Sequence, residues 1–268
     1  MLPRDAIAEA IRAAAPRGGP ALVAFLTAGF PGRERFTADL LKMDEAADVI
    51  EIGVPFSDPM ADGMTIQRSS RAALAEGVTL AWIIAELSNL VKRPRAPLLL
   101  MSYLNPLLAH GIGRLPAEAR AAGIAGFIVP DLPFEECADM RAALSDEGMA
   151  LVQMVTPVTP PARLAMLARE SEGFVYAVTM TGTTGRDVAV PDAVLDYLDR
   201  VRAAAAVPVC AGFGIRHAAQ VTRLSGHADG VIVGSALVEA LERGEDPAVF
   251  LRGLRSSVHS PPPWTPRR

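Results

Sequence analysis

Two acidic residues, Glu51 and Asp62, have the sequence surroundings of catalytic carboxyl groups. Glu51 interrupts an apolar, β-branched run at residues 49–52, where a buried strand would carry Val or Ile. Asp62 follows in a loop rich in Pro and Gly. An apolar pocket would raise the pKa of Glu51, whereas a polar loop would let Asp62 ionise more easily, so the pair could divide acid–base and electrostatic roles. The alternative is that Glu51 is a surface or salt-bridged carboxylate.

Glycines in the last third of the chain predict a phosphate site. Gly212 and Gly214 follow one predicted strand, and Gly234 and Ser235 follow the next. Glycine lets backbone N–H groups approach an anion, and the N-terminus of a helix adds a positive dipole. The hydroxyl of Ser235 could donate a further hydrogen bond. The alternative is that these glycines only form tight turns between strand and helix.

Other polar and aromatic residues at predicted strand ends allow two interpretations each. Asp131 fits either a turn or the capped start of a helix. Tyr103 and Tyr176 could line a pocket or simply pack. The dipeptide at residues 105–106, Asn-Pro, predicts a turn.

The elements that must position these residues alternate between strand and helix. Short apolar runs, typical of strands buried on both faces, are each followed by a helical pattern. The predicted strands are residues 21–27, 49–52, 97–101, 124–129, 150–155, 174–179, 207–211 and 230–233. Eight such units in about 250 residues favour a barrel over an open doubly wound sheet. With an amphipathic helix at residues 5–14, the predicted fold is α/β, a (β/α)8 TIM barrel with an extra N-terminal helix.

The barrel would bring the candidate residues together, because active sites of such barrels lie at the C-terminal ends of the strands. Nearly every Gly-, Pro- and polar-rich cluster directly follows a predicted strand. No linker divides the chain, so we expect a single domain over residues 1–268. Residues 260–268 are expected to be a disordered Pro-rich tail.

Composition narrows the function classes. The net charge of −4 gives no basic footprint for nucleic acid. Two distant cysteines and four histidines show no metal-ligand spacing, so no metal is expected. The N-terminus lacks the apolar region of a signal peptide, and no apolar stretch is long enough to span a membrane. We therefore expect a cytoplasmic protein.

Taken together, these residues resemble the tryptophan synthase α subunit family. The most specific segment is EIGVPFSDPMADG at residues 51–63, and the resemblance covers nearly the whole chain. The other segments that carry it are residues 22–29, 131–136 and 212–215. The resemblance implies a carbon–carbon lyase of tryptophan biosynthesis, which cleaves indole-3-glycerol phosphate into indole and D-glyceraldehyde 3-phosphate by a retro-aldol reaction.

The resemblance also implies roles for individual residues. Glu51 would be the general acid/base, and Asp62 would hold the indole N–H. Tyr176 would lie near the glutamate, and Thr184 would lie on a loop, residues 181–189, that closes over the site. Phosphate-binding positions are matched by Gly185, Gly214, Gly234 and Ser235. Indole-pocket positions are matched by Phe25, Met101, Tyr103, Ile128, Phe213 and Ile232, for which ordinary core packing is the alternative.

The family resemblance further implies a partner. A β subunit carrying pyridoxal phosphate would take indole onward to tryptophan in an α2β2 complex and would activate this chain, which needs no cofactor of its own. The partner-facing surface would include Asp58, Pro59 and the region around residues 105–106.

Three departures from the family pattern leave other functions open. Met64 stands where Pro is usual, Thr183 where a small aliphatic residue is expected, and Arg216 where a small Ser-like residue is common. Arg216 could strengthen the phosphate site or point to solvent. The alternatives are a stand-alone lyase that releases free indole, a catalytically dead activating partner, and a phosphosugar isomerase. The retained carboxyl groups argue against the second, and an indole-sized pocket would argue against the third.

Overall fold

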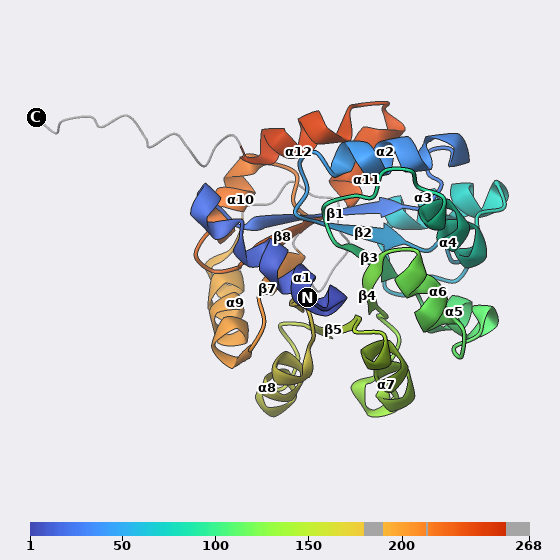
Figure 1. The fold of residues 1–268 in the computed structure, drawn as a ribbon. Helices are drawn as coiled ribbons and strands as arrows, with labels where there is room; N and C mark the ends of the chain where they lie inside the picture. The colour runs from blue at the N-terminus through green and yellow to red at the C-terminus, as the bar shows by residue number, and fades with distance from the viewer. Residues whose placement is uncertain (180–189, 213, 256–268) are drawn as a thin grey trace, which may run out of the picture.

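A closed parallel barrel forms the centre of the computed structural model, which describes residues 1–179, 190–212 and 214–255. Within these residues eight strands pair in chain order, and the first pairs with the last (Figure 1). The strands are β1 (Ala21–Thr27), β2 (Val49–Gly53), β3 (Leu98–Met101), β4 (Ile124–Ile128), β5 (Ala150–Val155), β6 (Val175–Val178), β7 (Val209–Gly212) and β8 (Gly230–Val233). The predicted number and order of strands are confirmed.

Helices surround the barrel (Figure 1). They are α1 (Pro3–Arg12), α2 (Phe36–Met43), α3 (Met64–Ala75), α4 (Leu80–Ser88), α5 (Leu104–His110), α6 (Leu115–Ala121), α7 (Ala138–Asp146), α8 (Pro161–Glu170), α9 (Asp192–Ala204), α10 (Ala218–Leu224), α11 (Ser235–Glu242) and α12 (Pro247–Arg255), with short 3₁₀ turns at Ala15–Arg17, Arg33–Arg35 and Phe134–Glu136. None of the described helices is both long and apolar enough to cross a bilayer. The predicted tail and the loop at residues 181–189 lie outside the described residues.

Helix α1 is the extra element predicted ahead of the first strand. Its Ile7 and Ile11 are buried in the cluster that fills the barrel interior, together with Val23 and Phe174. Helix α1 contacts β1, β2 and β4. The helix therefore covers the N-terminal end of the barrel and leaves the opposite end open for a site.

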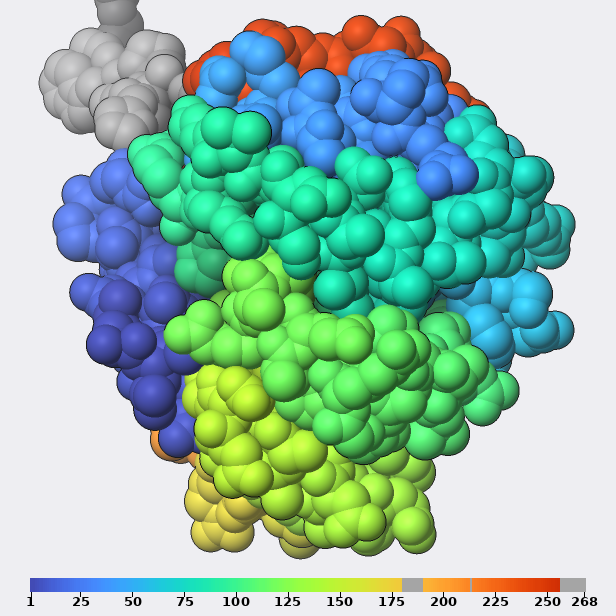
Figure 2. All heavy atoms as spheres, turned by 45° about the vertical axis from the view of Figure 1, so that its right-hand side comes forward, coloured from blue at the N-terminus to red at the C-terminus, as the bar shows by residue number. Residues whose placement is uncertain are grey.

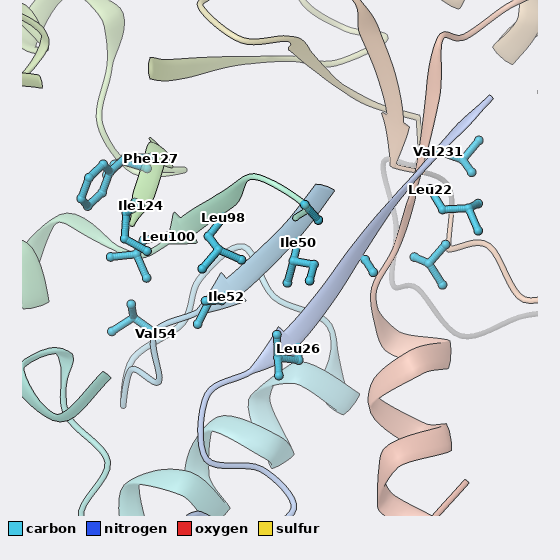
Figure 3. Packing of buried hydrophobic residues seen from close by; sticks show 14 of the residues in the cluster. Leu22, Leu26, Ile50, Ile52, Val54, Leu98, Leu100, Ile124, Phe127 and Val231 are labelled. Atoms are coloured by element: carbon cyan, nitrogen blue, oxygen red, sulfur yellow. The ribbon is translucent and has the colours of Figure 1, made fainter. Parts of the chain in front are cut away.

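Side-chain alternation along β2 explains why Glu51 faces inward. Ile50 and Ile52 belong to the outer apolar layer between strands and helices, part of which Figure 3 shows around β1, β2 and β3. Val49 belongs to the interior cluster. Because successive strand residues point to opposite faces, Glu51 points into the barrel with Val49.

The turn predicted at residues 105–106 is wrong, because this segment lies in the first turn of α5. Proline is tolerated there because N–H groups in the first turn have no partner within the helix. The N–H of Leu104, the first residue of α5, donates to Oδ1 of Asp131 at 2.9 Å. Asp131 is thus a capping residue, although it caps α5 and not the helix that follows it.

Candidate active site

A cavity of about 500 Å³ opens at the C-terminal end of the barrel. Strand ends and the loops after them supply its walls. The lining residues are Phe25, Glu51, Met60, Ala61, Asp62, Gly63, Ile66, Met101, Pro130, Met154, Tyr176, Val178, Gly212, Gly214, Ile232, Gly234 and Ser235. Its volume and largely apolar lining suit a small organic ligand.

Glu51 is the fully buried acid of this cavity. In the barrel it lies between Phe25 of β1 and Leu99 of β3. Among the described residues, neither carboxyl oxygen has a hydrogen-bond partner, which excludes the surface or salt-bridged alternative. Burial raises the pKa of Glu51 to about 8. At neutral pH the side chain is therefore mostly a neutral carboxylic acid that can give a proton to a bound molecule.

Asp62 lies in a less polar setting than its loop sequence suggested. It is partly buried, and burial raises its pKa, whereas a hydrogen bond with the Tyr103 hydroxyl opposes this rise. The same hydroxyl accepts the N–H of Ala61 at 2.9 Å. Tyr103 therefore holds the loop and favours the charged form of Asp62. The carboxylate of Asp62 thus has a stabilising hydrogen bond, whereas the carboxyl group of Glu51 has none within the described residues.

Tyr176 lies on β6 close to both acids. Burial raises its pKa well above the ordinary value, and the charges of Glu51 and Asp62 add to the rise. The hydroxyl therefore stays protonated and can only donate or accept hydrogen bonds. Space for its ring depends on Gly212, where an added Cβ would lie 2.8 Å from Cε1 of Tyr176.

Two of the predicted phosphate-binding residues, Gly234 and Ser235, form the start of α11, and a third, Gly214, lines the same cavity. Gly214 adopts φ +71°, a left-handed conformation that favours glycine. Gly234 precedes the first turn of α11, and Ser235 is the first residue of that helix. Gly214, Gly234 and Ser235 all line the cavity. The unpaired N–H groups and positive dipole of the helix start thus face the space where an anion would lie.

The predicted apolar pocket is assembled only in part. Phe25, Met101 and Ile232 line the main cavity. Tyr103 lines a small adjoining cavity that also contacts Asp62, whereas Ile128 is fully buried in the interior cluster. Thr184, Gly185 and Phe213 lie outside the described residues. The functional roles of all these residues remain predictions.

Several lining residues were not predicted. Met154 and Val178 lie at or next to the last residue of β5 and β6, so their strand position alone was a usable signal. Ile66 comes from α3 and packs against Phe25 in a small apolar cluster at the cavity mouth. Nothing in its sequence position indicated this, because the path of the loop before α3 decides where that helix begins.

The fold and this cavity place the chain in the class of TIM-barrel proteins with a ligand-sized cavity at the C-terminal end of the barrel. A sequence model described as "Tryptophan synthase alpha chain" matches residues 11–258. The chain therefore belongs to the tryptophan synthase alpha chain family.

Individual relatives agree with this assignment. The tryptophan synthase alpha chain of Nitratidesulfovibrio vulgaris strain DP4 is 48% identical over 243 residues, covering 90% of this chain and 95% of the relative. That of Chloroflexus aurantiacus is 42% identical over 264 residues, covering 95% and 99%. Among solved structures, tryptophan synthase from Mycobacterium tuberculosis matches with a TM-score of 0.87 and 33% identity, covering 95% of this chain and 98% of that one. A tryptophan synthase complex from Pyrococcus furiosus matches with a TM-score of 0.78 and 35% identity, covering 89% and 96%.

Proposed function

We propose that this chain cleaves indole-3-glycerol phosphate into indole and D-glyceraldehyde 3-phosphate, with Glu51 as the acid/base. The observation that carries the residue assignment is the fully buried Glu51 carboxyl group, which lines the same cavity as Asp62. Family membership supports the reaction class. The lyase reaction needs a proton delivered at one carbon and removed from a neighbouring hydroxyl, which one carboxyl group can do.

Glu51 would act first as an acid. Its neutral form gives a proton to the indole ring carbon that bears the glycerol chain. The carbon–carbon bond then breaks, and its electron pair returns to the ring and restores aromaticity. The adjacent hydroxyl loses its proton to the Glu51 carboxylate as the aldehyde forms. One proton is given and one is taken back, so the enzyme ends as it began.

Asp62 would stabilise the charge that forms between these steps. Protonation of the ring carbon places positive charge on the indole nitrogen, and an ionised carboxylate that accepts the N–H stabilises it. The Tyr103 hydrogen bond supports this role because it favours the ionised form of Asp62. Phe25, Met101 and Ile232 would contact the flat faces of the ring.

The phosphate end of the substrate would lie at the start of α11. Gly214, Gly234 and Ser235 line that part of the cavity. Thr184 and Gly185 are proposed to complete the site from the loop after β6. Indole-3-glycerol phosphate carries its phosphate at one end and its indole ring at the other. A single cavity that contacts both the start of α11 and Glu51 can hold both ends.

Replacing Glu51 by Gln tests the assignment. The variant should release indole from indole-3-glycerol phosphate about 10²–10⁴-fold more slowly, because the amide cannot transfer the proton. Binding of inorganic phosphate should be kept. Glu9→Gln, an exposed change on α1 at the other end of the barrel, is the matched control. Near-normal turnover by Glu51→Gln would show that another group moves the proton.

Family membership also implies a tryptophan synthase complex with a β subunit, and the Pyrococcus furiosus structure is described as a tryptophan synthase complex. We propose α2β2 assembly through the segments around Asp58, Pro59 and α5. The Phe56 and Tyr103 rings are 5.2 Å apart and join the loop after β2 to the start of α5. Figure 2 shows the teal surface that follows this loop against the green surface that contains α5. Exposed apolar side chains of this region are Met60, Met64 and Leu108.

A stand-alone lyase is the alternative that these features allow, although the two relatives described above are named alpha chains. Steady-state indole release with and without an added tryptophan synthase β subunit separates the two. We expect the partner to raise the rate, and Leu108→Glu to weaken this activation. A rate that the partner leaves unchanged would favour the stand-alone enzyme.

A further inference from the structure

One carboxylate, that of Glu239, joins three segments around the cavity mouth. Helix α3 begins two residues after Asp62, and α11 begins at Ser235. The two helices pack against each other. Thr65 in the first turn of α3 donates its hydroxyl to Oε1 of Glu239 at 3.0 Å. Glu239 lies four residues after Ser235, so both side chains lie on the same side of α11.

The third segment is the loop after β7, through Arg216. Its guanidinium donates from Nη1 to Oε2 of Glu239 at 2.8 Å and from Nη2 to Oε1 at 3.0 Å. The N–H of Arg216 donates to Oε1 of Gln220 at 2.8 Å, which fixes the loop that begins with Gly214. Arg216 therefore does not simply point to solvent, and it is absent from the cavity lining. Arg216 and Thr65 therefore both donate to the Glu239 carboxylate, and they share its Oε1.

This pair is stronger than an ordinary surface ion pair. Both side chains are only about one-fifth exposed, at 22% and 23%, and the geometry is bidentate. The Arg216 hydrogen bonds also lower the pKa of Glu239, so its carboxylate stays ionised at neutral pH. Arg216 neutralises a negative charge one turn from the proposed phosphate position, where it would otherwise repel the ligand.

We propose that Glu239 is a positioning residue that couples the Asp62 loop to the phosphate-binding start of α11. The proposal rests on the proposed function, in which the indole end of the substrate lies at Asp62 and the phosphate end lies at the start of α11. A phosphate group bound at the start of α11 would restrict the motion of α11 and of the loop after β7. Through Glu239 and Thr65 it would then order the start of α3 and, with it, Asp62.

The chain supplies a matched control on the same two helices. Arg68 of α3 and Glu242 of α11 form a second ion pair one turn further along, at 2.5 Å. Their side chains are 55% and 41% exposed, so this pair should contribute little. Glu242→Ala removes a carboxylate from α11, as Glu239→Ala does, without touching Thr65 or Arg216.

Binding of the two substrate halves measures the coupling. Calorimetry gives the Kd of indole alone and with saturating glycerol 3-phosphate. In the wild-type protein we expect glycerol 3-phosphate to tighten indole binding by about fivefold or more. This factor should fall close to one in Glu239→Ala and decrease in Thr65→Val, which keeps the Arg216–Glu239 pair. It should be unchanged in Glu242→Ala.

Two outcomes would overturn the proposal. The first is a coupling factor in Thr65→Val and Glu239→Ala equal to that of the wild-type protein. The second is independent binding of the two ligands to a wild-type protein that releases indole normally. A wild-type protein that neither releases indole nor binds these ligands would overturn the proposed function itself. Thr65→Val removes one hydroxyl, so it keeps the test decisive if Glu239→Ala does not fold.

Discussion

The Glu51 carboxyl group lowers the stability of the barrel that contains it. Its folded-state pKa is about 8, against an ordinary value of 4.5. Between these values the unfolded chain releases a proton that the folded chain keeps. The ionisation of Glu51 therefore adds no penalty below pH 4.5, and the stability of the folded state falls as the pH rises toward 8. Under the proposed function, this cost keeps a neutral acid in the cavity at neutral pH.

Glu51→Gln should therefore stabilise the protein more at alkaline than at acidic pH. The amide cannot ionise, so the stability difference should grow by about 1.4 kcal/mol for each pH unit between the two pKa values. Urea unfolding at pH 5.5 and pH 8 measures it. A difference that is the same at both pH values would mean that Glu51 ionises freely in the folded protein.

Tyr103→Phe should change the pH dependence of catalysis. Without the hydroxyl, Asp62 loses the hydrogen bond that opposes the rise of its pKa. The acidic limb of the kcat/KM profile should move to higher pH, while the alkaline limb, which we assign to Glu51, should stay near pH 8. Tyr197→Phe is the matched control, because the buried Tyr197 hydroxyl has no hydrogen-bond partner within the described residues. An acidic limb that stays in place would show that the Tyr103 hydroxyl does not affect the ionisation of Asp62.

At the scale of elements, strand ends determine the shape of the cavity. Gly212 ends β7, and its carbonyl oxygen accepts the Thr179 hydroxyl at 2.9 Å. The missing side chain at Gly212 leaves room for the ring of Tyr176 on the neighbouring strand. The position of this ring in the cavity lining thus depends on the absence of a methyl group at Gly212 on the next strand.

Gly212→Ala should displace Tyr176 and lower kcat/KM by about tenfold, because misplacement of site groups is costly even where the fold is kept. Indole release measures the loss, and circular dichroism checks the fold. Gly113→Ala is the control, since no atom outside the neighbouring residues lies within 4 Å of its added Cβ. Equal activity of the two variants would contradict this packing argument.

The sequence predicted the elements well because their signals are local. The apolar runs predict the strands, and the Gly- and Pro-rich loops predict which end of the barrel carries the cavity. The position of Glu51 between Ile50 and Ile52 predicts its burial. Three features could not be predicted from the sequence, because they depend on contacts between distant segments. These are the helix at residues 104–110 capped by Asp131, the burial of Asp62 against Tyr103, and the pairing of Arg216 with Glu239. No local pattern contains such information.

At the scale of the whole molecule, Asp48 ties both ends of the described chain to β2. Its carboxylate accepts the N–H of Leu22 at 2.8 Å and the guanidinium groups of Arg17 and Arg255 at 2.5 Å each. Asp48 directly precedes β2, at the end of the barrel opposite the cavity. In such barrels this end serves stability and not catalysis.

Asp48→Asn should therefore destabilise the fold by about 2 kcal/mol, less than for a fully buried pair because Arg17 is half exposed. Thermal unfolding measures this loss. Indole release well below the melting temperature should match the wild-type rate. A lowered rate with unchanged stability would place Asp48 in a different role.

The pairing of β1 with β8 has a consequence for synthesis of the protein. Ala21 pairs with Gly230, so β1, which also pairs with β2, gains its second neighbour only when nearly the whole chain has left the ribosome. Until then the growing sheet has two open edges and an apolar interior without its last wall. Open strand edges of this kind can pair with strands of other chains. We therefore expect the nascent chain to be most prone to aggregation just before β8 emerges.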